Sequence, residues 1–295
     1  DAKYRVYVTG SNAKMLSKEV ATTLGGRFFI YDAYPYSFKE YLAAQQVELR
    51  EHWEYDTIQR SEVKRHLNEY FYYGGLPEIL SFKNKRAMLS SLYQKIYLGD
   101  ICARNNIKND RVLNILIKKM AESVKQPLSY NRLKNVIVAT GSPISVPTTI
   151  DYVDYASDSW LILPMENEVG KLTEKEMQKK YYFVDNGLLN LFLMNSETSL
   201  LENVVAVELC RRFGKKNVFF LSAEKEIDFI VPDEKLAIQV SYSIKDATTY
   251  NREVPPLVKY AKAHQDWKCL LITYDEEGAE EGIPVVSVWK WLMEV

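Results

Sequence analysis

The sequence has few of the residues from which disulfide frameworks and zinc sites are built. Only three cysteines occur in 295 residues, and Cys102, Cys210 and Cys269 lie far apart without a CxxC pair. Three cysteines cannot all pair, and zinc-binding cysteines usually come in closely spaced pairs. The three histidines are equally scattered. We therefore expect reduced thiols, no disulfide framework and no metal site built from these residues.

Long hydrophobic runs and an excess of charge of one sign are also missing. No uninterrupted apolar run approaches the roughly 20 residues of a membrane-spanning helix. Hydrophobic residues make up 47% and charged residues 26% of the chain, as in soluble globular proteins. We expect a cytoplasmic protein without a membrane partner. The formal net charge of -1 gives no global attraction for nucleic acid, so any DNA contact would need a local basic patch.

The sequence also lacks a phosphate-binding loop. Such a loop requires G-x-x-x-x-G-K-[ST], because its backbone N–H groups surround the phosphates, its lysine reaches the β and γ oxygens and its hydroxyl holds magnesium. Gly170-Lys171 and Gly214-Lys215 are each followed by neither Ser nor Thr, and no glycine lies five residues before either. The chain as given should therefore bind MgATP very weakly or not at all.

Hydrophobic patterns predict an α/β and α+β multidomain protein. Near the N-terminus, a strand at 4–8, a turn, a helix at 13–24 and a second strand at 27–31 fit an α/β sheet. The strand at 4–8 begins almost at once, which suggests that earlier strands precede it. Residues 57–104 are helical with a break at 73–77, where two glycines permit a bend and Pro77 starts a new helix.

The second half alternates between helices and strands. Three helical stretches, at 111–124, 129–138 and 146–159, precede two strands at 160–163 and 180–184 that can pair as a β-wing, which indicates a winged helix. An α/β/α unit is expected after them. Its predicted elements are a helix at 200–213, strands at 218–221, 227–231 and 236–240, a helix at 256–265, a strand at 269–273 and an end helix near Trp289.

Short motifs occur in a fixed order along nearly the whole chain. They are VTGSNAKMLS (8–17), GR (26–27), YPYSFKEY (34–41), YGGLPE (73–78), YFVDNGL (182–188), LENVVA (201–206), EIDF (226–229) and QVS (239–241). In order and spacing they resemble predicted prokaryotic AAA+ ATPases that carry a C-terminal domain of unknown function. The resemblance implies four segments: a remnant of the AAA+ core at 1–50, a helical lid or connector at 51–109, a winged-helix-like segment at 110–185 and a nuclease-like α/β domain at 186–295.

The resemblance gives the N-terminal segment a nucleotide-sensing role. It places Ser11 or Asn12 at the end of the sensor strand, near the γ-phosphate of ATP, where a small polar side chain can hydrogen-bond oxygen without adding charge. Either residue can equally well cap the following helix. Arg27 is a candidate phosphate sensor, and a plain surface arginine is the alternative. ATP and Mg²⁺ are thus expected cofactors of the full-length protein, whose P-loop would lie upstream of Asp1, and this chain alone should bind neither.

The last segment resembles the PD-(D/E)xK nuclease fold. Such sites hold Mg²⁺ between carboxylates, and a lysine positions water or stabilises the leaving charge. The matching residues here are Glu202, Asp228, Gln239 and Ser241. Gln239 lacks the charge of a carboxylate and Ser241 lacks the cation, although Lys245 is close enough in sequence to replace it. We expect a retained fold with an inactive, vestigial site.

A nucleic-acid contact has its best candidates on the first two helices of the winged-helix-like segment. Four basic residues could meet phosphates there: Lys118, Lys119, Arg132 and Lys134. The third helix, at 146–159, carries three aspartates and no basic residue, so it should not read bases. We expect DNA binding, if any, to be weak and non-specific. An ordinary solvated face is the alternative.

Two functions remain open. The sequence indicates the C-terminal portion of an ATP-binding AAA+ ATPase that is inactive alone, and the alternative is a non-enzymatic module that binds DNA or a protein partner. The oligomeric state does not follow from the sequence.

Overall fold

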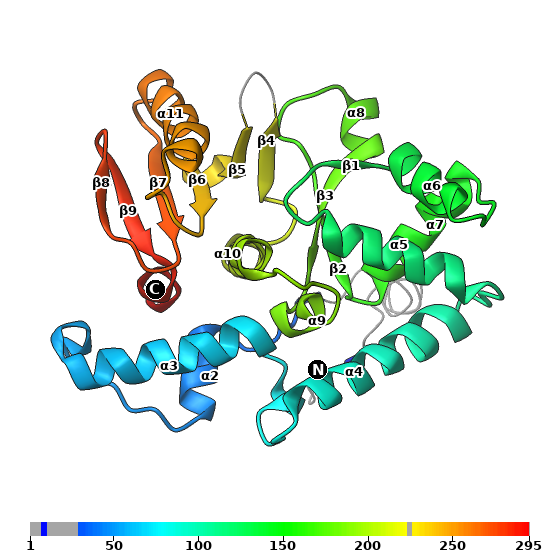
Figure 1. Cartoon of the computed structure of the whole chain (residues 1–295), viewed down its shortest axis with the longest axis horizontal. Helices are drawn as coiled ribbons and strands as arrows, with labels where there is room; N and C mark the ends of the chain where they lie inside the picture. Colours follow the sequence, from blue (N-terminus) through cyan, green and yellow to red (C-terminus); the bar gives the residue numbers. More distant parts are fainter. Residues whose placement is uncertain (1–6, 11–28, 223–225, 295) are drawn as a thin grey trace, which may run out of the picture.

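The computed structural model of the chain describes residues 7–10, 29–222 and 226–294. Helices line one side of the molecule, and a six-stranded sheet with a helix on each face occupies the other (Figure 1). A smaller, three-stranded sheet lies between these two parts. The expected mixed α/β architecture is confirmed at this level.

The short strands expected near the N-terminus do not form in the described part of that segment. Residues 7–8 and 29–31 belong to no strand, and Phe29 and Tyr31 are 89% and 87% exposed. A strand needs a neighbour that accepts and donates its backbone hydrogen bonds. No described strand runs beside either segment. The strand predictions are therefore wrong for these residues.

The helices of the predicted connector form as expected from 57 to 103. A first helix, α2 (Phe38–Ala44), is closed by reciprocal hydrogen bonds between Ser37 and Glu40. α3 (Thr57–Tyr73) ends at Gly74, whose φ of +77° would be strained for a residue with a side chain. The remaining elements are the 3₁₀-helices η1 (Trp53–Tyr55) and η2 (Pro77–Ile79), α4 (Lys85–Gln94) and the π-helix η3 (Lys95–Ala103).

Three helices and a small sheet follow, as predicted. The helices are α5 (Asp110–Glu122), α6 (Tyr130–Ala139) and α7 (Val146–Asp158). Strands β2 (Ile162–Met165) and β3 (Gln178–Phe183) pair antiparallel, with Ile162 opposite Phe183. The sequence did not predict the two remaining elements of this segment, which are the strand β1 (Leu128–Ser129) beside β3 and the helix α8 (Leu172–Met177).

The C-terminal half is a sheet in the order β4-β5-β6-β7-β9-β8. Its strands are β4 (Phe219–Ser222), β5 (Glu226–Val231), β6 (Leu236–Ser241), β7 (Lys268–Thr273), β8 (Gly278–Glu280) and β9 (Ile283–Ser287). The pairs β6–β7 and β7–β9 are parallel, and the others are antiparallel. The helices and turns of this half are α9 (Asn186–Asn190), α10 (Glu197–Phe213), η4 (Pro232–Glu234), α11 (Ala247–Ala263) and α12 (Val288–Met293).

Two features of this half differ from the prediction. α11 begins at Ala247, not at residue 256, because Asp246 caps it and the helix continues through Pro255 and Pro256. The β8–β9 hairpin was not expected at all. Its strands are short, and its mostly exposed β8 carries little of the hydrophobic signal from which strands are predicted.

Each face of the large sheet has its own apolar core. α10 packs on one face, with Phe229 and Ile238 among the buried residues, and α11 packs on the other, with Ile227 and Leu271. The first core continues without a break into the helices of the first half. Side chains on both sides of the predicted boundary at 185/186 therefore pack together, and the three predicted domain boundaries stay predictions.

Two expectations from composition concern the whole described chain. Cys102, Cys210 and Cys269 are buried free thiols, as predicted. Within the described ranges, no helix combines the length and the apolar character required to cross a lipid bilayer.

Candidate functional site

A buried lysine lies between three carboxylates where β3, α10 and β5 meet. Lys180 is fully buried, and its Nζ lies 3.2 Å from Glu202 Oε1, 3.3 Å from Asp228 Oδ1 and 3.0 Å from Glu226 Oε1. Tyr182 also donates a hydrogen bond of 2.8 Å to Glu202 Oε1. We call these five residues the Lys180 cluster.

The local folds that build the cluster follow from strand and helix periodicity. Lys180 and Tyr182 are two residues apart on β3, so their side chains point to the same face. Glu226 and Asp228 share a face of β5 for the same reason. Glu202 lies on the buried side of α10, the helix that packs against β3 and against β6, the neighbour of β5 (Figure 1).

Burial governs the charge state of the cluster. Burial, and then the neighbouring Glu202, raise the pKa of Asp228 to about 8, and Lys180 offsets this only in part. Burial alone would lower the pKa of Lys180, but the carboxylates of Glu202, Asp228 and Glu226 together raise it above its ordinary value. Lys180 is thus held as a cation, and Asp228 binds its proton more tightly than an exposed aspartate does.

The ammonium group occupies the place that a metal ion would need. Mg²⁺ binds carboxylate oxygens at about 2.0–2.1 Å. An ion bound to both Glu202 Oε1 and Asp228 Oδ1 would touch Lys180 Nζ, which lies 3.2 and 3.3 Å from the same two atoms. Among the described residues, no group of three His, Cys, Asp or Glu side chains is arranged to hold a metal. The arrangement does not fit Mg²⁺ while Lys180 stays in place.

The other two predicted nuclease residues face different partners. Gln239 donates a 2.5 Å hydrogen bond to Glu253 on α11 and accepts one of 3.4 Å from the backbone N–H of Asp228. Ser241 donates to the backbone carbonyl of Ser243. The structure therefore places Glu202 and Asp228 in one cluster, whereas the side chain of Gln239 bonds the backbone of Asp228 and the carboxylate of Glu253.

The cation of this site comes from a position that sequence reasoning missed. Lys245, the substitute suggested by sequence proximity, is exposed and lies beyond the end of β6. Lys180 fills the role instead, from a strand 22 residues before Glu202 on the chain. The signal that could have revealed it is the period of two on β3, which puts Lys180 on the same side as Tyr182.

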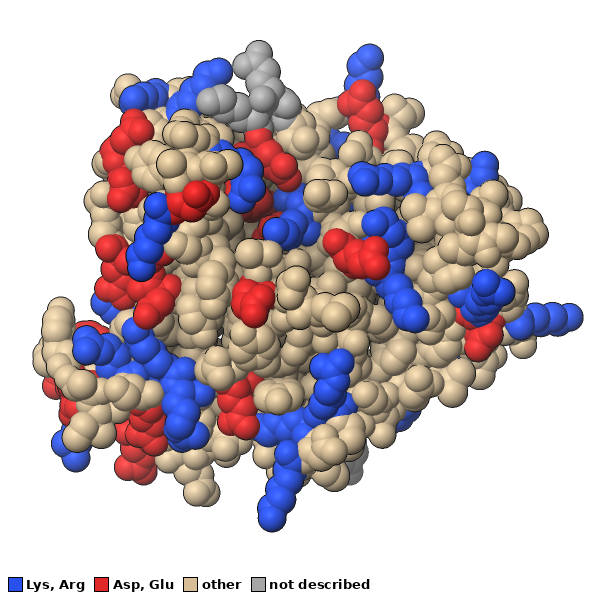
Figure 2. All heavy atoms as spheres, in the orientation of Figure 1, with Lys and Arg blue, Asp and Glu red and all other residues tan. Residues whose placement is uncertain are grey.

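The predicted basic residues differ in their surroundings. Lys119 forms an ion pair of 3.4 Å with Glu122 on the same helix. Lys118 lines a cleft described below, and Arg132 and Lys134 lie on α6. Lys and Arg side chains alternate with Asp and Glu over the face shown in Figure 2 and form no single basic patch there. The acidic helix α7 forms as predicted, with Asp151 and Asp154 exposed.

A second buried carboxylate fastens the motif at 73–78 to the motif at 182–188. Asp185 accepts hydrogen bonds from the backbone N–H groups of Gly75, Gly187 and Leu188, at 2.7, 2.8 and 3.3 Å. Burial raises the pKa of Asp185 to about 6, although these N–H donors act in the opposite direction. A Cβ atom on Gly187 would lie 2.1 Å from the backbone oxygen of Tyr73, so the two segments meet without room for a side chain.

Two curated proteins are similar to almost the whole chain. The uncharacterized protein MJ1544 of Methanocaldococcus jannaschii is 31% identical over 313 residues, which cover 99% of this chain and 69% of that protein. An uncharacterized protein of Haemophilus influenzae is 32% identical over 299 residues, covering 98% and 71%. The chain belongs to the family of these two proteins. Neither name states an activity, and no solved structure matches the chain.

Two family models match parts of the chain. A model described as AAA domain matches residues 1–42, and one described as a domain of unknown function (DUF8612) matches residues 64–199. The chain thus contains an AAA-type region at its start, as the motifs predicted. The nucleotide-sensing candidates Ser11, Asn12 and Arg27 fall within the matched range but outside the described residues, so their roles stay predictions.

Proposed function

We propose that this chain acts as part of an ATP-dependent AAA-type protein. The AAA match at residues 1–42 supports the nucleotide-binding class. In this proposal the phosphate-binding loop, and with it the ATP and Mg²⁺ sites, belongs to a part of the protein outside residues 1–295. Ser11, Asn12 and Arg27 would contribute as sensors of the bound nucleotide. The chain alone would then be inactive as an ATPase.

The observation that carries the proposal is a junction between the end of the AAA match and α10. Arg211 donates a 2.6 Å hydrogen bond to the backbone carbonyl of Pro35, and its guanidinium lies 3.7 Å from the Glu40 carboxylate. Lys215, just beyond α10, pairs with Asp32 at 3.3 Å. Residues 32–40 are therefore held by charged groups of the C-terminal half.

The turn at Gly74-Gly75 adds a second point of attachment to this junction. Tyr36 donates its backbone N–H to the carbonyl of Gly75 at 2.8 Å, and Tyr70 donates its hydroxyl to the carbonyl of Tyr36. Because Asp185 binds the N–H of the same Gly75, a displacement of residues 32–40 would be felt by α3, α9 and α10 together. Such a junction suits the transfer of a nucleotide-driven movement to the rest of the chain.

The C-terminal half would serve this protein as a binding module with a nuclease-like fold and without nuclease activity. A helix with a glutamate, a strand with an aspartate and the α/β/α layering support the fold assignment. The ammonium of Lys180 between the carboxylates supports the absence of catalysis. The three helices and the β2–β3 pair would form the winged-helix-like part of the module.

Calorimetric titration of ATP tests the first part of this proposal. We expect the intact gene product to bind MgATP, and the polypeptide 1–295 to bind it very weakly or not at all, because it lacks the phosphate-binding amides and the magnesium-binding hydroxyl. Micromolar affinity of the polypeptide 1–295, or no binding by the intact product, would contradict the proposal.

Hydrogen exchange of the intact protein tests the junction. We expect nucleotide to change the exchange of α10 in the wild type, and Arg211→Gln to abolish that change. Arg212→Gln is the matched control, since Arg212 contacts the same Glu208 but points to the carbonyl of Trp291 rather than to Pro35. An equal loss in both variants would mean that the junction does not transmit the nucleotide signal.

A further inference from the structure

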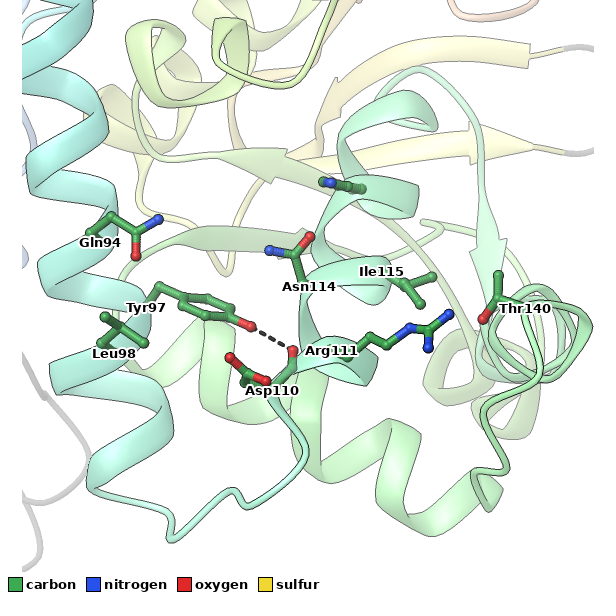
Figure 3. A pocket seen from close by; sticks show the side chains of 9 residues that line it. Gln94, Tyr97, Leu98, Asp110, Arg111, Asn114, Ile115 and Thr140 are labelled. Atoms are coloured by element: carbon green, nitrogen blue, oxygen red, sulfur yellow. Dashed lines mark hydrogen bonds between the residues drawn. The ribbon is translucent and has the colours of Figure 1, made fainter.

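An open cleft of about 590 Å³ lies beside the π-helix η3, and no residue of the Lys180 cluster lines it. Gln94, Tyr97 and Leu98 form one wall, and residues of α5 form the facing wall (Figure 3). Thr140, after the end of α6, closes one side. The volume lies in the range of small-ligand sites, so the cleft can hold a nucleotide or two but not a duplex.

The positive charges of the cleft have no partners in the described part of the chain. Arg111 and Lys118 are both exposed and line the cleft, and neither forms an ion pair with another described residue. By contrast, the neighbouring Lys119 is paired with Glu122. Asp110 is the single acidic residue in the lining. The cleft therefore offers two free cations against one carboxylate.

Between Arg111 and Lys118 the lining of the cleft is polar, and a hydrogen bond joins its two walls. Asn114 lies on α5 between Arg111 and Lys118, and Gln94 faces it from α4 (Figure 3). Tyr97 on η3 donates a 2.5 Å hydrogen bond to the carbonyl of Asp110, which ties the two walls together. π-Helical segments are rare and frequently occur at functional sites.

We propose that this cleft binds single-stranded nucleic acid. Arg111 and Lys118 are seven residues apart, about 10 Å along α5, so they would contact different phosphates of one strand. The carboxamide of Gln94 offers the donor and acceptor pair that binds base edges, which only an unpaired base exposes fully. Asn114, whose side chain also hydrogen-bonds the Tyr97 hydroxyl, adds its acceptor oxygen. The half-exposed Leu98 and the partly exposed Ile115 give the bases an apolar surface.

This assignment changes which basic residues matter. Lys119 is paired with Glu122, and the nearby Lys125 donates to the Thr198 hydroxyl. Arg111, which the sequence pattern did not single out, takes the place of Lys119 beside Lys118. The proposal does not depend on ATP binding, because no residue of the cleft lies in the AAA match.

Fluorescence anisotropy with labelled single-stranded 12-mers and a hairpin duplex tests the proposal. We expect the wild-type chain to bind the single strand more tightly than the duplex. The double variant Arg111→Gln/Lys118→Gln should lose tenfold or more in affinity at low salt, and its salt slope should fall by roughly 1.4, about 0.7 for each lost phosphate contact. The double variant Lys119→Gln/Lys125→Gln removes the same charge and should change affinity by less than about threefold.

Four outcomes would overturn the proposal. They are the absence of single-strand binding by the wild type at 50 mM salt, an equal loss of affinity in both double variants, tighter binding of the duplex, and displacement of the strand by a glutamate-rich peptide that binds the cleft more tightly.

Thermal melts of all variants show whether each is folded, and Asn114→Leu tests the carboxamide in a chain that keeps both cations. We expect Asn114→Leu to weaken binding to an adenine-containing strand more than to a strand of abasic sites, and an equal effect on both would also count against the proposal.

Discussion

The Lys180 cluster and the cleft beside η3 contain similar charged groups in opposite surroundings. In the cluster, one ammonium is enclosed by three carboxyl groups at 3.0–3.3 Å and is fully buried. In the cleft, Arg111 and Lys118 are exposed and pair with no described carboxylate. Charges that neutralise one another inside a fold stabilise it or fix its shape, whereas unpaired charges at the surface remain free to meet a ligand.

A match to a motif alone therefore does not locate a functional site in this chain. Glu202 and Asp228 occupy nuclease-like motif positions, yet their oxygen atoms already bind Lys180. Arg111 belongs to no motif, yet it is exposed and lines the cleft.

Removing the buried cation should have the largest effect on stability. Lys180→Met keeps an unbranched apolar side chain, one atom shorter, but leaves Glu202 and Glu226 without their counter-ion, which typically costs about 3–5 kcal/mol for a buried pair. The matched variant Lys179→Met, on the same strand, breaks pairs with the more exposed Glu166 and Glu176 and should cost about 1 kcal/mol or less. Urea unfolding of both variants measures the difference, and equal losses would show that Lys180 is not the centre of a buried cluster.

The pH dependence of stability should reveal the proton on Asp228. Its pKa is about 8 in the folded chain, against about 3.9 when unfolded, so the native state keeps a proton that the unfolded state releases between these values. This group therefore lowers the free energy of unfolding as pH rises from about 4 to 8. Asp228→Asn imitates the protonated form, so its free energy of unfolding should increase relative to that of the wild type as pH rises from about 4 to 8.

Urea titrations at several pH values test this expectation. A gap between Asp228→Asn and the wild type that grows with pH supports a neutral Asp228. A variant that instead loses stability relative to the wild type as pH rises would show that Asp228 is an ionised partner of Lys180.

The helix η3 beside the cleft should tolerate an added methyl group at Gly99, whereas the packed Lys180 cluster would not tolerate a comparable addition. Gly99 lies in η3, and a Cβ atom there would meet nothing within 4 Å in the described structure. Gly99→Ala should therefore stabilise the chain by about 0.5–1 kcal/mol, since alanine loses less backbone entropy on folding than glycine. Thermal unfolding measures this small gain. A loss of stability would mean that the cleft wall is more tightly constrained than its contacts indicate.

Periodicity and turn residues predicted most of the local structure. The helices from 57 to 158 and the strands β2 to β7 appear close to their expected positions because each combines a regular apolar pattern with a clear cap or turn, such as Asp56 or Gly74. The expected strand at 27–31 does not form in residues 29–31. Its apolar residues carry the local propensity, but a strand also depends on a neighbour that the sequence does not reveal.

The site was harder to predict because it is assembled from distant segments. Glu202 and Asp228 were found through their motifs, and the structure brings them together. Lys180 was not found, since the nuclease-like pattern places its lysine at Ser241, and only the folded arrangement of β3 against α10 carries Lys180 into the same position. The cleft likewise depends on two helices whose facing sides cannot be paired from the sequence.

The most direct test of the central claim is a metal-binding and cleavage experiment on the Lys180 cluster. The chain is titrated with Mn²⁺ in a calorimeter and incubated with supercoiled DNA, linear DNA and RNA in Mg²⁺ or Mn²⁺, beside Asp228→Ala, Lys180→Met and Lys245→Ala. We predict no saturable Mn²⁺ binding at the cluster and no cleavage, because the ammonium of Lys180 occupies the metal position and Gln239 adds no charge. Cleavage by the wild type that disappears in Asp228→Ala would contradict this account; its loss in Lys180→Met or in Lys245→Ala would then identify the catalytic cation.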